Sequence, residues 1–209
     1  MSNDKPYAQW IEAVRHNRRA LLKVPEEFYT QELFNEAVLH DWEALYYVLP
    51  ELMTNEMIWG AVRQNGKALR HVPFNMLSPE LCLAGVKQNG LALLEVPNEL
   101  QTPEICLAAV KQNGRALDVI FPIGWRTMDL CLAAVQQNGL ALCLVPDVRI
   151  TPELCLQAVQ ESGRALQYVP ETQKTAEMCA EAVQQDGRAL RFVPDPLKTP
   201  ELRKMADDS

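Results

Sequence analysis

The chain has 209 residues, of which 48% are hydrophobic and 22% are charged, and its formal net charge is -7. This composition is typical of a globular protein with a buried core, and no apolar run approaches the roughly 20 residues that a membrane helix needs. The excess of acidic residues argues against nucleic-acid binding, which depends on clustered lysine and arginine. We therefore expect a protein that engages no membrane and no general nucleic acid.

The first residues, MSNDKPYAQW, lack the basic and apolar regions of a signal peptide. The chain contains six cysteines, and without an export signal a reducing compartment is the default. The sequence therefore predicts a cytoplasmic protein. Export as an effector without a classical signal peptide is the alternative.

One segment returns every 24 residues along nearly the whole chain. The stretch from Ser78 to Pro97, SPELCLAGVKQNGLALLEVP, is followed by a close copy that runs from Thr102 to Pro122. One valine fixes the register of the copies, and it recurs as Val14, Val38, Val62, Val86, Val110, Val135, Val159 and Val183. A period of this length indicates an array of stacked repeats. The single step of 25 residues reflects an insertion within DVIFPIGWR, between Leu117 and Thr127.

The first element of each copy is predicted to be an α-helix of about eleven residues. It begins after a Ser or Thr that is followed two residues later by an acidic residue in most copies, as at Thr30, Thr54, Ser78, Thr102, Thr127, Thr151, Thr175 and Thr199. A hydroxyl in this position caps the first N–H groups, and the acid favours the positive end of the helix. The helix ends at a polar residue and glycine, such as Asn65-Gly66, which predicts a left-handed terminal glycine.

The second element of each copy is predicted to be a shorter helix. It carries an alanine-leucine pair, from Ala20-Leu21 to Ala189-Leu190, and a proline then ends it in most copies, as at Pro73 and Pro97. The sequence thus predicts an all-α solenoid of about eight two-helix repeats. We expect one helical-repeat domain over 1–209, with degenerate repeats at about 6–54, regular repeats at about 55–198 and a partial cap at 199–209.

Two columns of small residues indicate how the repeats pack. The residue before the register valine is alanine or glycine in every copy, so helices are expected to approach closely along that line. Five of the six cysteines occupy the position four residues before this valine: Cys82, Cys106, Cys131, Cys155 and Cys179. Neighbouring helices lie about 8 to 10 Å apart, too far for a disulfide ladder, and no C-x-x-C pair supports a metal site. We interpret these cysteines as small buried hydrophobic residues and expect only Cys143 to be exposed.

The recurring pattern A-V-K-Q-N-G-x-A-L-x-x-V-P resembles the helical repeats of domain of unknown function 4116. The pattern is present from Ala109 to Leu117 and, with small changes, from Ala182 to Pro194. The resemblance extends from Glu56 to Glu201 and weakens in the first two copies, where Arg18 and Trp42 replace the glycine. It implies a helical repeat fold in bacterial and protist proteins, often beside other domains, and it supplies no catalytic residues.

No catalytic motif accompanies the repeats. The sequence has no P-loop, no G-x-S-x-G, no H-E-x-x-H and no Rossmann glycine pattern. His16 and His40 share a column that later copies fill with Gln64, Gln88 and Gln112, which favours a polar surface position. We therefore expect no catalytic residues, no cofactor and no metal, and the protein is not expected to be an enzyme.

The positions that change between copies are the best candidates for binding. The residue after the glycine is basic in five copies: Arg19, Lys67, Arg115, Arg164 and Arg188. Two further columns vary strongly, reading Leu22, Tyr46, Arg70, Leu94, Asp118, Cys143, Gln167 and Arg191, then Lys23, Tyr47, His71, Glu95, Val119, Leu144, Tyr168 and Phe192. Tyrosine and arginine are favoured at interface hot spots. We assign partner binding to Arg115, Arg164, Arg188, Tyr168, Phe192 and Trp125; the alternative is a solvated surface on which Tyr168 and Phe192 cover the next repeat.

These features predict a noncatalytic protein-binding module in a bacterial cytoplasm, an adaptor or immunity-type protein whose partner is another protein. Two alternatives remain: a secreted bacterial effector that scaffolds host proteins, and a repeat reader of single-stranded RNA. The net charge and the lack of a continuous basic row argue against the RNA reader.

Overall fold

The computed structural model describes residues 7–208, and every regular element in that range is helical. The chain divides into two compact units, Met1–Ile105 and Cys106–Ser209, which we call the N-terminal unit and the C-terminal unit. Residue 6, where the first repeat is predicted to begin, and Ser209 of the predicted cap lie outside the described residues. Within the described range no helix combines the length and the apolar character needed to cross a bilayer.

Each repeat contains three helical segments instead of two. The α-helices are α1 (Tyr7–His16), α2 (Gln31–His40), α3 (Asn55–Gln64), α4 (Pro79–Gln88), α5 (Pro103–Gln112), α6 (Met128–Gln137), α7 (Pro152–Glu161), α8 (Ala176–Gln185) and α9 (Pro200–Asp208). Six-residue 3-10 helices follow: η1 (Arg18–Lys23), η3 (Trp42–Tyr47), η5 (Gly66–His71), η7 (Gly90–Glu95), η9 (Gly114–Val119), η11 (Gly139–Leu144), η13 (Gly163–Tyr168) and η15 (Gly187–Phe192). A three-residue 3-10 turn completes each repeat: η2 (Glu26–Phe28), η4 (Pro50–Leu52), η6 (Phe74–Met76), η8 (Asn98–Leu100), η10 (Ile123–Trp125), η12 (Asp147–Arg149), η14 (Glu171–Gln173) and η16 (Asp195–Leu197).

The predicted helix starts are confirmed by capping hydrogen bonds. The amide of Leu33 donates to Thr30 Oγ1 at 3.2 Å, and the amide of Leu202 donates to Thr199 Oγ1 at 3.2 Å. The prolines predicted to end the second helix have an additional role. Pro73, with φ -57° and ψ 142°, stops η5 and also precedes the turn η6 as its N-cap. Its fixed φ and missing N–H suit both positions.

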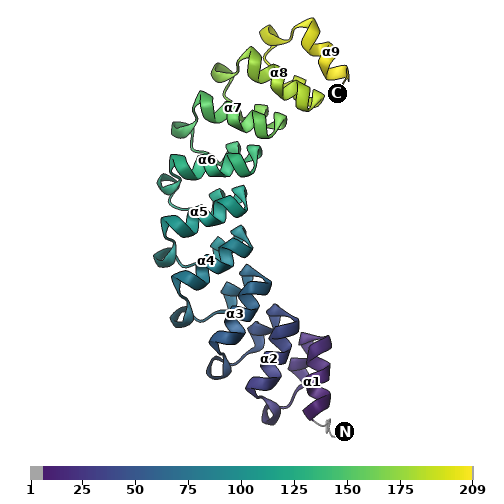
Figure 1. The fold of residues 1–209 in the computed structure, drawn as a ribbon, viewed down its shortest axis with the longest axis vertical. Helices are drawn as coiled ribbons and strands as arrows, with labels where there is room; N and C mark the ends of the chain where they lie inside the picture. The colour runs from purple at the N-terminus through teal and green to yellow at the C-terminus, as the bar shows by residue number, and fades with distance from the viewer. Residues whose placement is uncertain (1–6, 209) are drawn as a thin grey trace. The chain divides into compact units, whose positions relative to one another are not determined.

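Within each unit the repeats stack in two layers. Consecutive α-helices lie side by side in chain order (Figure 1), and the six-residue 3-10 helices contact one another in the same order. The register valines lie between these layers and are at most 2% exposed. The leucines of the alanine-leucine pairs from Leu21 to Leu166 are likewise buried, whereas Leu190 of the last pair is half-buried. The predicted all-α repeat architecture is therefore confirmed.

The glycines that follow the α-helices do not adopt the predicted left-handed conformation. No described residue has a positive φ. Asn65 instead has an extended backbone with φ -153° and begins η5, with its Oδ1 accepting from the Lys67 amide at 3.0 Å. The α-helix therefore passes directly into the 3-10 helix, without the turn that a left-handed glycine would make.

Glycine is needed because the next repeat approaches its backbone closely. A Cβ added to Gly163 would lie 2.5 Å from the carbonyl oxygen of Ala182, and one added to Gly114 would lie 2.6 Å from that of Ala134. These alanines belong to the predicted small-residue column. The same contact recurs between Gly187 and Ala206 of α9, so α9 packs as the first helix of a ninth repeat. The glycine column and the small-residue column are thus two sides of one contact between repeats.

A glutamine side chain joins the same two repeats by hydrogen bonds. Gln88 Oε1 accepts from the Gly66 amide at 2.7 Å, and its Nε2 donates to the Gln64 carbonyl at 3.0 Å. Gln185 repeats this arrangement, with Gly163 at 2.8 Å and Gln160 at 3.0 Å. The glutamine column predicted as a polar surface therefore bridges adjacent repeats at its edge.

We predict that Gly163→Ala destabilises the protein whereas Gly124→Ala does not. The new Cβ of Gly163→Ala would displace the backbone of the next repeat, which should cost about 1 to 3 kcal/mol. Gly124 has nothing within 4 Å of an added Cβ, so its variant should stay within about 0.5 kcal/mol. Urea unfolding of both variants measures the difference. Equal free energies of unfolding would contradict the close-approach role.

A second prediction concerns the one α-helix from α3 to α8 that ends in glutamate. Glu161 occupies the glutamine column but lacks the amide N–H that bridges repeats, and its Oε1 accepts from Gln157 within the same helix. Glu161→Gln should restore the bridge and remove a negative charge from the helix C-terminus. We expect a gain of about 1 kcal/mol in the free energy of unfolding. Gln160→Glu is a matched control on the same helix, and it should produce no gain.

Candidate partner-binding surface

The six-residue 3-10 helices present one outward line of side chains. Because a 3-10 helix has three residues per turn, its second and fifth positions lie in line. In η13 these positions are Arg164 and Gln167, whereas Ala165 and Leu166 are fully buried. The varied columns found in the sequence therefore lie on the solvent side of a constant frame.

The predicted basic column lies on this line in the C-terminal unit. Arg115, Arg164 and Arg188 are exposed, and their guanidinium groups make no hydrogen bond or ion pair with any described residue. Arg164 and Arg188 belong to the contacting helices η13 and η15. Arg115 on η9 is separated from them by η11, which carries Leu140 at the same position. The structure thus brings two of the three arginines together.

The two predicted aromatic residues differ in accessibility. Tyr168 is 39% exposed and lies in line with the buried Ala165, one third of a turn from Arg164. Phe192 is half-buried, and the Arg191 guanidinium covers its ring at 4.4 Å from the centroid. Assignment of Tyr168 and Phe192 to partner binding stays a prediction.

Trp125 belongs to the insertion and not to the line of arginines. It is 49% exposed on η10, and Phe121 nearby is 74% exposed. Arg126 holds the insertion in place by donating to the carbonyl of Leu144 at 2.9 Å and to that of Asp118 at 2.9 Å. The result is a fixed apolar projection on the three-residue turns.

The N-terminal unit contains a cluster that the sequence assignment missed. A cavity of about 230 Å3 lies along η1, η3 and η5, and we call it the aromatic cavity. Its lining residues are Arg18, Trp42, Glu43, Tyr46, Tyr47, Arg70 and His71. The rings of Tyr46 and Tyr47 meet edge to face at 5.1 Å, and the Tyr46 and His71 rings lie 5.4 Å apart. Tyr46 is 68% exposed, so a large aromatic surface is open to solvent.

Ion pairs between repeats fix the walls of the aromatic cavity. Arg18 donates to Asp41 Oδ2 at 2.5 Å and also pairs with Glu43, and the hydrogen bond to Asp41 raises the pKa of Arg18. Arg70 donates to Glu95 Oε1 at 2.6 Å. The charges of both arginines are thereby balanced by carboxylates of the following repeat.

His71 is a neutral member of the aromatic cavity. Burial lowers the pKa of His71, and the positive charge of Arg70 lowers it further, although Glu43 and Glu95 act in the opposite direction. Its ring lies 6.2 Å from that of Trp42. An uncharged imidazole at neutral pH therefore supplies aromatic surface to the cavity and no net charge.

The sequence contained two signals for the aromatic cavity. Trp42 replaces the glycine of the second copy, and the varied columns read Tyr46 and Tyr47 in that copy. Arg18 replaces the glycine of the first copy. In the sequence these replacements indicate only degenerate repeats, whereas in the structure both place a side chain against the next repeat.

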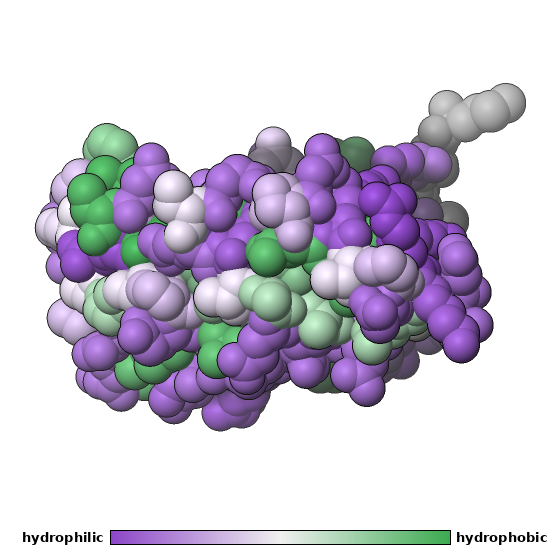
Figure 2. Space-filling model, turned by 90° about the horizontal axis from the view of Figure 1, so that it is seen from above, coloured by the Kyte–Doolittle hydropathy of each residue, from purple (hydrophilic) through white to green (hydrophobic). Residues whose placement is uncertain are grey.

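Exposed apolar side chains are scattered over one face of the molecule (Figure 2). Figure 2 shows a face on which hydrophobic residues form small patches between hydrophilic ones. Large continuous apolar areas mark permanent interfaces, so a dispersed pattern is typical of a surface that also faces water.

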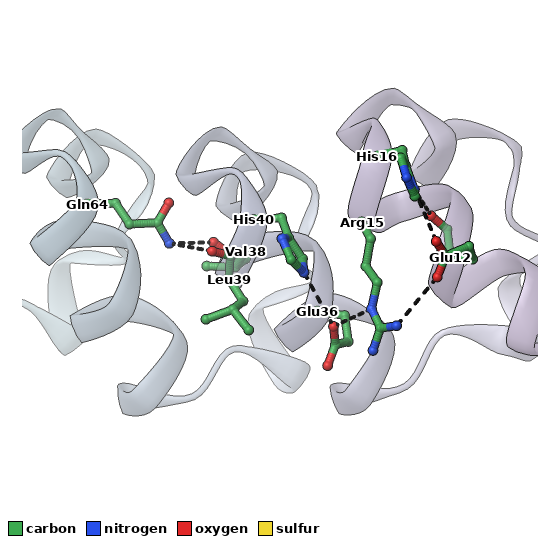
Figure 3. A network of polar contacts seen from close by, with 8 residues as sticks. All are labelled: Glu12, Arg15, His16, Glu36, Val38, Leu39, His40 and Gln64. Atoms are coloured by element: carbon green, nitrogen blue, oxygen red, sulfur yellow. Dashed lines mark hydrogen bonds and ion pairs between the residues drawn. The ribbon is translucent and has the colours of Figure 1, made fainter.

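The two histidines of the glutamine column lie on a polar surface, as predicted. His16 Nδ1 lies 3.4 Å from Glu12 Oε1, and His40 Nε2 lies 3.8 Å from Glu36 Oε2 (Figure 3). Arg15 Nε donates to Glu36 Oε2 at 2.8 Å and thereby joins α1 to α2. The pKa of Glu36 is lowered chiefly by this hydrogen bond. Each histidine faces a different carboxylate, so the structure does not bring them together.

The cysteine column is buried, as predicted. Cys82, Cys106, Cys131, Cys155 and Cys179 are at most 4% exposed and free, while Cys143 is exposed. Burial raises the pKa of Cys82 and of Cys155 to about 11. Over residues 7–208 no group of three His, Cys, Asp or Glu side chains is placed to hold a metal ion.

Two segments of the chain match a known family. Residues 78–122 and 151–198 match the family described as Domain of unknown function (DUF4116), which confirms the resemblance predicted from the repeats. No curated protein and no solved structure matches the chain. The matched segments begin at Ser78 and Thr151, both caps of α-helices, so the family boundary coincides with the structural repeat.

We predict that native protein reacts with one equivalent of a thiol reagent at pH 8 and that denatured protein reacts with six. Cys143 is exposed, whereas the other five thiols are buried and Cys82 and Cys155 are protonated at this pH. Cys143→Ser should abolish the fast reaction. The absorbance released by the thiol reagent after mixing measures the number of reactive thiols in the native and in the denatured protein. Rapid reaction of two or more thiols in the native protein would contradict the buried column.

Proposed function

We propose that the protein is a noncatalytic protein-binding module, acting as an adaptor or as an immunity-type partner of another protein. The aromatic cavity is the observation that carries this proposal. It combines the exposed side chains of Tyr46 and Arg70 with the half-buried side chain of Trp42, and these residue types are enriched at the hot spots of protein interfaces. The contacts between repeats hold these side chains in place before binding, which reduces the entropy lost on association.

The separation of each repeat into constant packing positions and varied outward positions supports the same function. Glycine, alanine, valine and glutamine positions join the repeats, whereas the outward line of the 3-10 helices changes from copy to copy. A repeat array with a constant frame and a varied face can adapt to a partner without loss of fold. A bacterial cytoplasm is the setting in which we expect this partner, and a secreted effector that scaffolds host proteins is the alternative.

The balanced charges of the aromatic cavity favour a protein partner over RNA. Aromatic side chains can stack on bases, but such sites also track the phosphate backbone with free cations. Arg18 and Arg70 are paired with Asp41, Glu43 and Glu95. Strong attraction of phosphates is therefore not expected at this surface.

The test compares proteins captured by the wild type, by Tyr46→Ala and by Tyr168→Ala from cells of the native organism. Tyr46 is 68% exposed, so Tyr46→Ala should leave the melting temperature nearly unchanged. We expect a specific partner whose recovery falls about tenfold with Tyr46→Ala, as loss of an interface hot spot predicts. Tyr168→Ala tests the predicted surface of the C-terminal unit, and its recovery should match the wild type if the aromatic cavity alone binds the partner. Quantitative mass spectrometry of the eluates gives the ratios.

Three results would redirect the proposal. Equal recovery of every protein by the wild type and Tyr46→Ala would remove the aromatic cavity as the binding surface. A fall in recovery of the partner with Tyr168→Ala and with the double variant Arg164→Glu and Arg188→Glu would instead place binding on the C-terminal unit. Loss of all capture after ribonuclease treatment would favour the repeat reader of single-stranded RNA.

A further inference from the structure

Another cavity of the N-terminal unit lies on the α-helical layer, away from the aromatic cavity. It has a volume of about 550 Å3 and runs between α2 and α3, and we call it the α2–α3 groove. Its walls include Leu39 of α2, which is 66% exposed, and Trp59 of α3. A volume of this size is within the range of sites that hold ligands or partner side chains.

Gly60 forms part of this wall, and packing does not explain it. Nothing lies within 4 Å of a Cβ added to Gly60, in contrast with Gly163 and Gly114. Glycine in the middle of an α-helix costs stability, and the corresponding position in α6 is Ala133. The one property that Gly60 adds is open space beside Leu39 and Trp59.

The charges along the groove follow a fixed order. Glu56, Gly60 and Arg63 are spaced at i, i+4 and i+7 on α3, so they lie along one face of the helix. Glu56 and Arg63 form no ion pair with any described residue, whereas Glu36 on the opposite wall binds Arg15. Arg63 lies over the Trp59 ring at 5.7 Å. The groove therefore presents an unpaired acid, an apolar centre and an unpaired base, in that order.

We propose that the α2–α3 groove binds an amphipathic helix of a protein partner. The partner helix carries a basic residue opposite Glu56, a large apolar residue over Gly60 and an acidic residue opposite Arg63. It runs antiparallel to α3, because its acidic residue then lies toward its own N-terminus and its basic residue toward its C-terminus, as the helix dipole favours. Read from its own N-terminus, its sequence signature is acidic, apolar and basic at i, i+3 and i+7.

This inference rests on the proposed protein-binding function, but it is independent of the aromatic cavity. The groove residues lie on α2 and α3, whereas the aromatic cavity is built from η1, η3 and η5. The two surfaces are therefore tested separately, the aromatic cavity by Tyr46→Ala and the α2–α3 groove by Gly60→Leu.

The experiment uses a displayed library of helical peptides, selected on the full-length wild-type protein and counter-selected on Gly60→Leu. Leucine should fill the open space without disturbing other side chains, because nothing lies within 4 Å of the first added atom. We expect enriched peptides with acidic, apolar and basic residues in the stated order. Their affinity for Gly60→Leu should be at least about tenfold weaker than for the wild type. Gln157→Leu, at the same repeat position in α7, should bind them as the wild type does.

A charge exchange provides a second readout that a structural effect would not produce. In the double variant Glu56→Arg and Arg63→Glu, the preferred peptides should carry their acidic and basic residues in the reverse order. Gly60→Ala should raise the melting temperature by about 2 to 4 °C, because it removes a helix glycine at no steric cost.

Two results would overturn the proposal. One is enrichment of no peptide that distinguishes the wild type from Gly60→Leu; the other is a charge order that does not reverse in the exchanged variant. If partner capture still depends on Tyr46 in either case, the protein-binding function stands and only the groove is rejected. If peptides bind as expected but capture is indifferent to Tyr46→Ala, the aromatic cavity fails and the groove stands.

Discussion

The close approach of a glycine to the backbone of the next repeat is the contact on which the rest of the structure depends. A Cβ added to Gly163 would lie 2.5 Å from the Ala182 carbonyl oxygen, which leaves no room for a side chain. The alanine must also be small, because the two backbones meet at this point. Gln185 then spans the same junction, accepting from Gly163 and donating to Gln160. One junction therefore constrains three residue types in two successive repeats.

In the first two repeats, side chains replace the glycine contact with the next repeat. Arg18 occupies the glycine position of the first repeat and pairs with Asp41 and Glu43 of the second. Trp42 occupies it in the second repeat, and its ring lies near His71 of the third. These contacts join neighbouring repeats as the glycine contact does elsewhere. They also leave aromatic and charged groups along the 3-10 helices, and this is how the aromatic cavity arises.

Gly60 shows the opposite relation between glycine and packing. Its added Cβ would meet nothing, so the residue weakens α3 without bringing two repeats closer together. Most glycines of the chain that follow an α-helix are required by the fold, whereas the fold does not require this one. The α2–α3 groove and the aromatic cavity thus lie on the two layers of the same unit, and each is framed by residues that depart from the common repeat.

The sequence by itself determined the repeat, its register and its buried columns. A 24-residue period, capping hydroxyls and invariantly small residues are local or periodic signals, and each can be read without knowing what lies nearby in space. Helix starts such as Thr30 and the buried cysteines followed from them.

Only the tertiary structure decided the roles of the glycine and glutamine columns and the presence of the aromatic cavity, because these features depend on contacts between copies. The role of Gly163 required the position of Ala182, since glycine at a helix end is equally consistent with a left-handed turn. The bridging role of Gln88 required the amide of Gly66, 22 residues away in the sequence. The aromatic cavity likewise joins Trp42 and Tyr46 to His71 of the next repeat, a proximity that only the stacking of the repeats creates.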